Sequence, residues 1–172
     1  MSNKDPDDLA KWAFLAQAPY RDAKHPRIEK IAAGLDLAAN GDARCYAHLA
    51  HALARDCIRY VSDTQRTGGE DIAGYTREPG ELDAVEALDR GRDDCDAKAR
   101  LFVALCLARG LTARMRPLWR RSADGDKLQH VSAEVLLGGR WQPVETTLAR
   151  ARLGEEPERV PKEAHTGQWL RG

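Results

Sequence analysis

The chain has 172 residues, enough for one domain to bury a hydrophobic core without metal or disulfide staples. Its 27 basic and 27 acidic side chains give a formal net charge of +0, so charge supports neither a nucleic-acid nor a membrane partner. The polar start and the lack of any run of about 20 apolar residues predict a cytoplasmic chain without signal peptide or transmembrane segment.

The first part of the chain is predicted to be helical. Prolines suited to a first helical turn predict helices over residues 6–18 and 26–39, within an N-terminal extension 1–41. Apolar residues at helical spacing predict a third helix over 42–61 that packs on the core. Residues 62–80, rich in Gly and Thr, predict a long loop of the kind that often forms a cleft wall or lid.

Cys95 stands at the predicted start of a central helix that runs to Arg109 and ends at Gly110. The unpaired N–H groups and partial positive charge of a helix N-terminus favour a thiolate, so this position predicts a lowered thiol pKa and suits a nucleophile. Asp94 and Asp96 act against this effect, because neighbouring negative charges raise the pKa of a thiol.

A small sheet is predicted after the central helix. Residues 112–119 form its first strand, and Pro117, which lacks an N–H, restricts that strand to an edge or a broken position. Residues 130–137 and 140–145 alternate around Gly138-Gly139, and this pattern predicts a β-hairpin with a tight turn.

The hairpin register predicts a close pair of functional side chains. A tight turn places Glu145 opposite Ser132, one diagonal step from His130 on the same face and within reach of its ring. Cys95, His130 and Glu145 then provide a nucleophile, a base and an orienting carboxylate, in that order along the chain.

The remaining cysteines and histidines predict no second site. Cys57 and Cys106 fall on apolar helix faces and are expected to be buried, and the four cysteines include no CxxC pair that would suggest a disulfide framework. Cys45, His48 and His51 have helical spacing, but no fourth ligand is evident, so we expect structural histidines, no metal and no cofactor.

These motifs resemble the transglutaminase-like superfamily of papain-like cysteine enzymes. The resemblance covers roughly residues 50–148 and is carried by Asp94-Cys95-Asp96-Ala97-Lys98-Ala99, by His130, and by the Gly-turn, Trp and Pro-Val-Glu-Thr-Thr run from 138 to 147. The chain departs from the family pattern at Asp93 in place of Gly, at Ser132 in place of an aromatic residue, and at Glu145 in place of Asp. None of these departures removes a required chemical function.

The resemblance implies an α+β fold. N-terminal helices would be followed by a central helix that bears the cysteine and packs on a small antiparallel sheet bearing the histidine and the glutamate. The chain would form one domain, 1–172, with a core over about 42–148 and a tail, 149–172, whose placement the sequence does not predict.

The implied reaction is acyl transfer at an amide bond of a protein or peptide through a thioester on Cys95, with His130 as base and Glu145 as its partner. The Cys95 N–H is a candidate oxyanion donor, and Tyr60 is a second one by analogy with an upstream aromatic in related enzymes, with a structural tyrosine as the alternative. Hydrolysis by a cysteine peptidase or amidase is the main interpretation. Transglutaminase crosslinking of Gln to an amine and a catalytically silent peptide-binding module are the alternatives, and the sequence does not define the oligomeric state.

Overall fold

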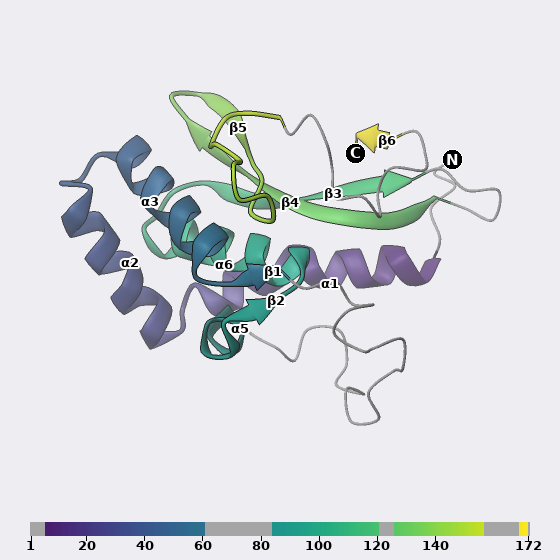
Figure 1. Cartoon of the computed structure of the whole chain (residues 1–172), viewed down its shortest axis with the longest axis horizontal. Helices are drawn as coiled ribbons and strands as arrows, with labels where there is room; N and C mark the ends of the chain where they lie inside the picture. Colours follow the sequence, from purple (N-terminus) through teal and green to yellow (C-terminus); the bar gives the residue numbers. More distant parts are fainter. Residues whose placement is uncertain (1–5, 61–83, 121–125, 157–168, 172) are drawn as a thin grey trace.

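The fold is built around one central helix that is enclosed by a sheet and by other helices. The computed structural model describes residues 6–60, 84–120, 126–156 and 169–171. Helix α6 (Cys95–Ala108) lies against a four-stranded sheet, and helices α1 (Pro6–Asp22) and α3 (Ala43–Asp56) pack on it from other directions (Figure 1). Every residue from Lys98 to Cys106 is buried, as expected for a helix enclosed on all sides. The predicted α+β fold, with a cysteine helix packed on a sheet, is confirmed.

The sheet has the strand order β5-β4-β3-β6, and each neighbouring pair is antiparallel. Its strands are β3 (Ala113–Arg120), β4 (Lys127–Leu137), β5 (Arg140–Val144) and β6 (Trp169–Arg171). Leu137 faces Arg140 and Ala133 faces Val144, so the predicted register of the tight hairpin is confirmed. The tail, unplaced by the sequence, contributes β6 to the far edge of this sheet.

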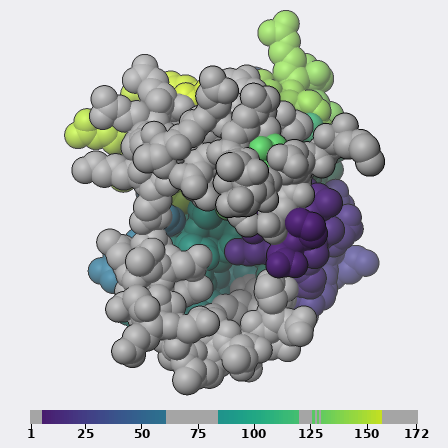
Figure 2. All heavy atoms as spheres, turned by 90° about the vertical axis from the view of Figure 1, so that its right-hand side faces the viewer, coloured from purple at the N-terminus to yellow at the C-terminus, as the bar shows by residue number. Residues whose placement is uncertain are grey.

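The described residues before α6 include the helices α1 (Pro6–Asp22), α2 (Pro26–Ala38), α3 (Ala43–Asp56) and α5 (Ala84–Arg90). Two short parallel strands, β1 (Arg59–Tyr60) and β2 (Arg92–Asp93), join the chain after α3 to the approach to α6. Figure 2 views the molecule from the right-hand side of Figure 1 and shows α1 in purple at one flank, with teal atoms of the α5–α6 part of the chain beside it. The predicted loop 62–80 lies outside the described residues.

The predicted helix over 42–61 is too long. Helix α3 ends at Asp56 and Cys57 is its C-cap, after which Arg59 and Tyr60 are extended because they pair with Arg92 and Asp93. Cys57 is therefore exposed, and its predicted burial is wrong, while Cys106 is buried as predicted. All four cysteines lie among the described residues and are free thiols.

Two prolines, Pro19 and Pro117, lie inside regular elements. Helix α1 continues through Pro19 to Asp22 rather than ending at 18, and Asp22 makes buried contacts with two other elements. Pro117 lies in β3, which has β4 on one side along its whole length but meets β6 only from Leu118 onward. The prediction of an edge position therefore holds for the part of β3 that contains Pro117. No helix among the described residues has the length and apolar character needed to cross a membrane.

Candidate active site

The start of α6 is fixed by the two carboxylates that directly precede it, those of Asp93 and Asp94. Asp94 is the N-cap, and its side chain accepts a hydrogen bond from the Ala97 N–H at 3.3 Å. Asp93, only 2% exposed, accepts from the Asp94 N–H at 3.0 Å and forms an ion pair with Arg90. These bonds hold Cys95 as the first residue of the helix, with its backbone N–H among those that have no acceptor inside the helix.

The Cys95 thiol lies against strand β4, and its environment favours the neutral form. Burial raises the pKa of the Cys95 thiol well above its ordinary value, and Asp94 and Asp96 raise it further. A hydrogen bond with the backbone of Val131 lowers the pKa, but it does not outweigh these effects. The predicted lowering by the helix N-terminus is therefore wrong in its net result. The same Val131 contact places the thiol beside the residue that follows His130.

His130 and Glu145 form a buried hydrogen-bonded pair. The imidazole Nε2 lies 2.8 Å from Glu145 Oε2, and the two residues are 3% and 1% exposed. His130 is in β4, and Glu145 follows Val144, the last residue of β5. The predicted cross-strand proximity is confirmed, and the glutamate, one methylene longer than an aspartate, reaches the ring directly.

The Glu145 carboxylate is ionised in this setting. Burial raises the pKa of Glu145, but the hydrogen bonds and charge of His130 and the bonds from Thr147 outweigh it, so the net shift is downward. Thr147 donates to Oε1 twice, from its backbone N–H at 2.7 Å and from Oγ1 at 2.6 Å. Because an ionised carboxylate only accepts, His130 Nε2 carries a proton, and in the neutral ring Nδ1 is the basic nitrogen.

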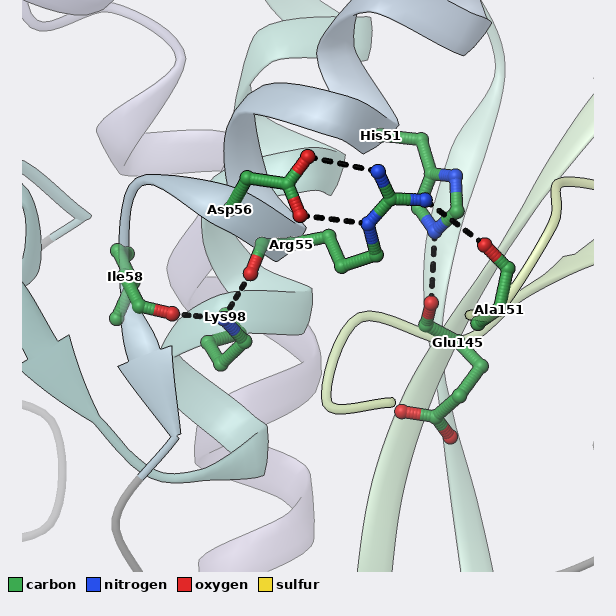
Figure 3. A network of polar contacts seen from close by, with 7 residues as sticks. All are labelled: His51, Arg55, Asp56, Ile58, Lys98, Glu145 and Ala151. Atoms are coloured by element: carbon green, nitrogen blue, oxygen red, sulfur yellow. Dashed lines mark hydrogen bonds and ion pairs between the residues drawn. The ribbon is translucent and has the colours of Figure 1, made fainter. Parts of the chain in front are cut away.

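A second buried histidine touches the same glutamate, and the sequence did not indicate this contact. His51 Nε2 lies 2.7 Å from the backbone carbonyl oxygen of Glu145 (Figure 3). His51 is in α3, is 2% exposed, and its ring meets the edge of Phe102 in a T-shaped arrangement. The one available signal was its place in the buried stripe of α3, beside Ala47, Ala50 and Ala54.

Lys98 occupies the turn of α6 that follows Cys95 and ties this helix to α3. Its Nζ donates to the backbone carbonyl of Arg55 at 2.8 Å and to that of Ile58 (Figure 3). Burial lowers the pKa of Lys98 to about 8. Lys98 therefore fastens the cysteine helix to the end of α3 and supplies a donor to a carbonyl in the last turn of α3.

The other candidate residues do not gather into a site. Tyr60 faces Asp93 in the β1–β2 pair, two residues before Cys95, and its role as an oxyanion donor stays a prediction. Cys45 and His48 are exposed whereas His51 is buried. Among residues 6–60, 84–120, 126–156 and 169–171, no cluster of three or more His, Cys, Asp or Glu side chains has a metal-binding arrangement.

Residues 58–146 match the model of a protein family described as the transglutaminase-like superfamily, and this segment is just over half of the chain. No curated protein matches the sequence. A candidate protease from Parabacteroides distasonis ATCC 8503 has a similar structure, with a TM-score of 0.57 and 12% identity over 80% of this chain. A candidate cysteine protease from Cytophaga hutchinsonii gives a TM-score of 0.48 and 16% identity over 83% of this chain. The similarity covers 26% and 43% of those two proteins, so this chain corresponds to only part of each.

Proposed function

Because the chain belongs to the transglutaminase-like superfamily, we propose that it cleaves an amide bond of a protein or peptide through a thioester on Cys95. The observation that carries the proposal is the buried His130–Glu145 hydrogen bond of 2.8 Å, together with the contact between the Cys95 thiol and the backbone of Val131, the residue after His130. This arrangement supplies a nucleophile, a base whose tautomer is fixed, and a negative charge that stabilises the protonated base.

In the proposed reaction His130 acts as a general base, and it does not form a thiolate–imidazolium ion pair with Cys95 before substrate binds. Burial and the carboxylates around Cys95 raise the pKa of its thiol, so the sulfur is neutral at pH 7 until its proton moves to His130 Nδ1. The sulfur then attacks the amide carbonyl, a C–S bond forms, and the oxygen becomes an oxyanion. The Cys95 N–H at the helix start and Tyr60 are the proposed donors to that oxyanion.

The tetrahedral intermediate then breaks down in two stages, release of the amine and hydrolysis of the thioester. His130 returns the proton to the leaving amine as the C–N bond breaks, which leaves the acyl group as a thioester on Cys95. Water attacks this thioester while His130 again takes a proton, and a carboxylic acid leaves as the thiol re-forms. Glu145 keeps its own charge throughout and stabilises the imidazolium.

We favour water over an amine as the acceptor because hydrolysis needs no residue beyond these three, whereas crosslinking also needs a site that binds the amine. A library of peptide amides is incubated with wild type, Cys95→Ala and His130→Ala, with and without a fluorescent amine. We expect cleavage by wild type alone, and an intact-mass increase equal to the acyl group when the thioester is trapped by rapid acid quench.

The alternatives give different results in the same experiment. Preferential incorporation of the amine would replace hydrolysis by transglutaminase chemistry at the same residues. Binding of peptides without cleavage or thioester, unchanged in Cys95→Ala, would replace the enzyme by a silent peptide-binding module.

A further inference from the structure

The C-terminal half of α3 contacts both parts of the proposed site. Lys98 of the cysteine helix donates to the Arg55 carbonyl at 2.8 Å, and Arg55 Nη1 donates to the Ala151 carbonyl at 3.0 Å. One turn earlier, His51 contacts the Glu145 backbone at 2.7 Å. Figure 3 shows these side chains lying between α6 and the segment that carries Glu145. Helix α3 therefore connects the nucleophile's helix to the carboxylate's segment.

We infer that His51 is a positioning residue that sets where the Glu145 carboxylate lies relative to His130 Nε2. This inference rests on the proposed function. Glu145 follows the last residue of β5, so its backbone lies beyond the last residue pair of that strand, Val144 with Ala133. The bond from His51 fixes the Glu145 carbonyl where strand pairing no longer does, and Thr147 fixes the carboxylate at the other end.

The chemistry of the contact defines the state of His51. A backbone carbonyl only accepts hydrogen bonds, so His51 Nε2 must carry the proton. Burial lowers the pKa of His51, which keeps the ring neutral in this tautomer at pH 7. The ring is held in place by Phe102, with centroids 6.5 Å apart at 90°. His51 acts through Glu145 and does not itself donate to the reacting atoms.

His51 would affect the reaction rate through the precise placement of the Glu145 carboxylate. A shift of about 1 Å at a catalytic group can reduce the rate on the order of a hundredfold. Loss of the His51 bond frees the Glu145 backbone to move, which weakens the His130–Glu145 hydrogen bond and lowers the stability of the imidazolium. The thiol then gives up its proton less readily, and this change is measurable without knowing the substrate.

The test is the rate of Cys95 alkylation by iodoacetamide at pH 7, followed by intact mass in a Cys45→Ser, Cys57→Ser background because both of those thiols are exposed. The variants are His51→Leu, His51→Gln, Glu145→Gln and the double variant His51→Leu, Glu145→Gln. Tyr46→Phe is the matched control, because Tyr46 in α3 also donates from a buried side chain to a backbone carbonyl, that of Leu105 at 2.6 Å. Tm is measured for each variant.

We expect His51→Leu to slow alkylation about tenfold, His51→Gln to stay within threefold because its amide can donate to the same carbonyl, and Tyr46→Phe to stay within twofold despite a comparable loss of Tm. In the Glu145→Gln background, His51→Leu should cause little further loss, since the carboxylate that it positions is gone. If His51→Leu does not fold, His51→Asn, whose amide is too short to reach, takes its place with the same expected loss.

The outcomes that overturn the inference are distinct from failure of the proposed function. Equal rates for His51→Leu and Tyr46→Phe, or independent effects of His51→Leu and Glu145→Gln, would overturn the positioning role while the triad stands. An unchanged rate in Glu145→Gln itself would overturn the proposed triad, and the positioning role with it.

Discussion

Two of the buried carboxylates, Asp22 and Glu145, are paired with different kinds of base. Asp22, 2% exposed at the end of α1, binds the guanidinium of Arg100 in α6 at 2.8 Å and the Ala84 N–H at 3.1 Å. Glu145, 1% exposed, binds the imidazole of His130 at 2.8 Å and both donors of Thr147. Both acids are fully satisfied by hydrogen bonds, and both join segments that are far apart in the sequence.

The difference lies in whether the partner can lose its proton. A guanidinium stays charged at any pH that a protein tolerates, so the Asp22 pair can only hold α1, α5 and α6 together. An imidazole exchanges its proton near neutral pH, so the Glu145 pair can stabilise a charge that appears during a reaction. Burial and hydrogen bonding alone therefore do not distinguish a structural pair from a reactive one, and the chemistry of the base does.

The largest expected effect belongs to the structural pair. Asp22→Asn leaves Arg100 buried without its counter-charge, and we expect the free energy of unfolding to fall by about 3–5 kcal/mol, measured by urea denaturation. Alkylation of Cys95 in the folded protein should stay within twofold of wild type. A variant of normal stability with a slow Cys95 would contradict the division between the two pairs.

The reactive pair should behave in the opposite way. Glu145→Gln keeps the shape of the side chain but removes the charge that stabilises the imidazolium, and we expect turnover to fall about a hundredfold or more, or about 2.7 kcal/mol. Unfolding in urea should show a smaller loss of stability than in Asp22→Asn. Near-normal turnover would mean that Glu145 is structural as well, and Glu134 would then be the next carboxylate to test.

Thr147 refines the comparison of the two pairs because its hydrogen bonds go to the Glu145 carboxylate rather than to the His130 ring. Thr147→Val removes the Oγ1 donor and keeps the backbone N–H, so we expect about a tenfold loss of turnover, or roughly 1.4 kcal/mol. The Tm of Thr147→Val should stay near that of wild type. A loss as large as that of Glu145→Gln would show that the hydroxyl, rather than the pair of donors, fixes the carboxylate.

The smallest expected effect is a difference in acid stability between wild type and Glu145→Gln. The folded-state pKa of Glu145 is lowered from 4.5, so its contribution to stability is present above about pH 4.5 and is lost as pH falls through the folded value. The stability of wild type should therefore decline more steeply than that of Glu145→Gln as the pH falls below about 4.5. Parallel curves would show that the carboxylate gains nothing from its partners.

The sequence predicted the parts of this site that depend on local geometry. The Gly138-Gly139 turn determines the hairpin register, and that register brings Glu145 to His130. The predicted start of the central helix at Cys95 is confirmed, and the structure shows Asp94 as its N-cap. The division into a core and two extensions, the cytoplasmic location and the catalytic roles stay predictions.

What the sequence missed depends on contacts between distant segments. The end of α3 follows from the pairing of Arg59 with Arg92 and from the bonds that Lys98 makes to the end of that helix. The raised pKa of Cys95 follows from burial against β4, which local patterns do not reveal. His51 and Glu145 are 94 positions apart, and only the tertiary contact between α3 and the segment that follows β5 brings them together.

The most direct test of the account is the rate of Cys95 alkylation by iodoacetamide from pH 5 to 10, in wild type and in His130→Ala, both in the Cys45→Ser, Cys57→Ser background. The account predicts a wild-type rate that still rises with pH above 8, because the thiol pKa is raised. It also predicts that loss of His130 slows alkylation at least tenfold at pH 7 and by a smaller factor at pH 10, where hydroxide removes more of the thiol proton without His130. Identical profiles for the two proteins would show that His130 does not act on Cys95 and would contradict the proposed enzyme.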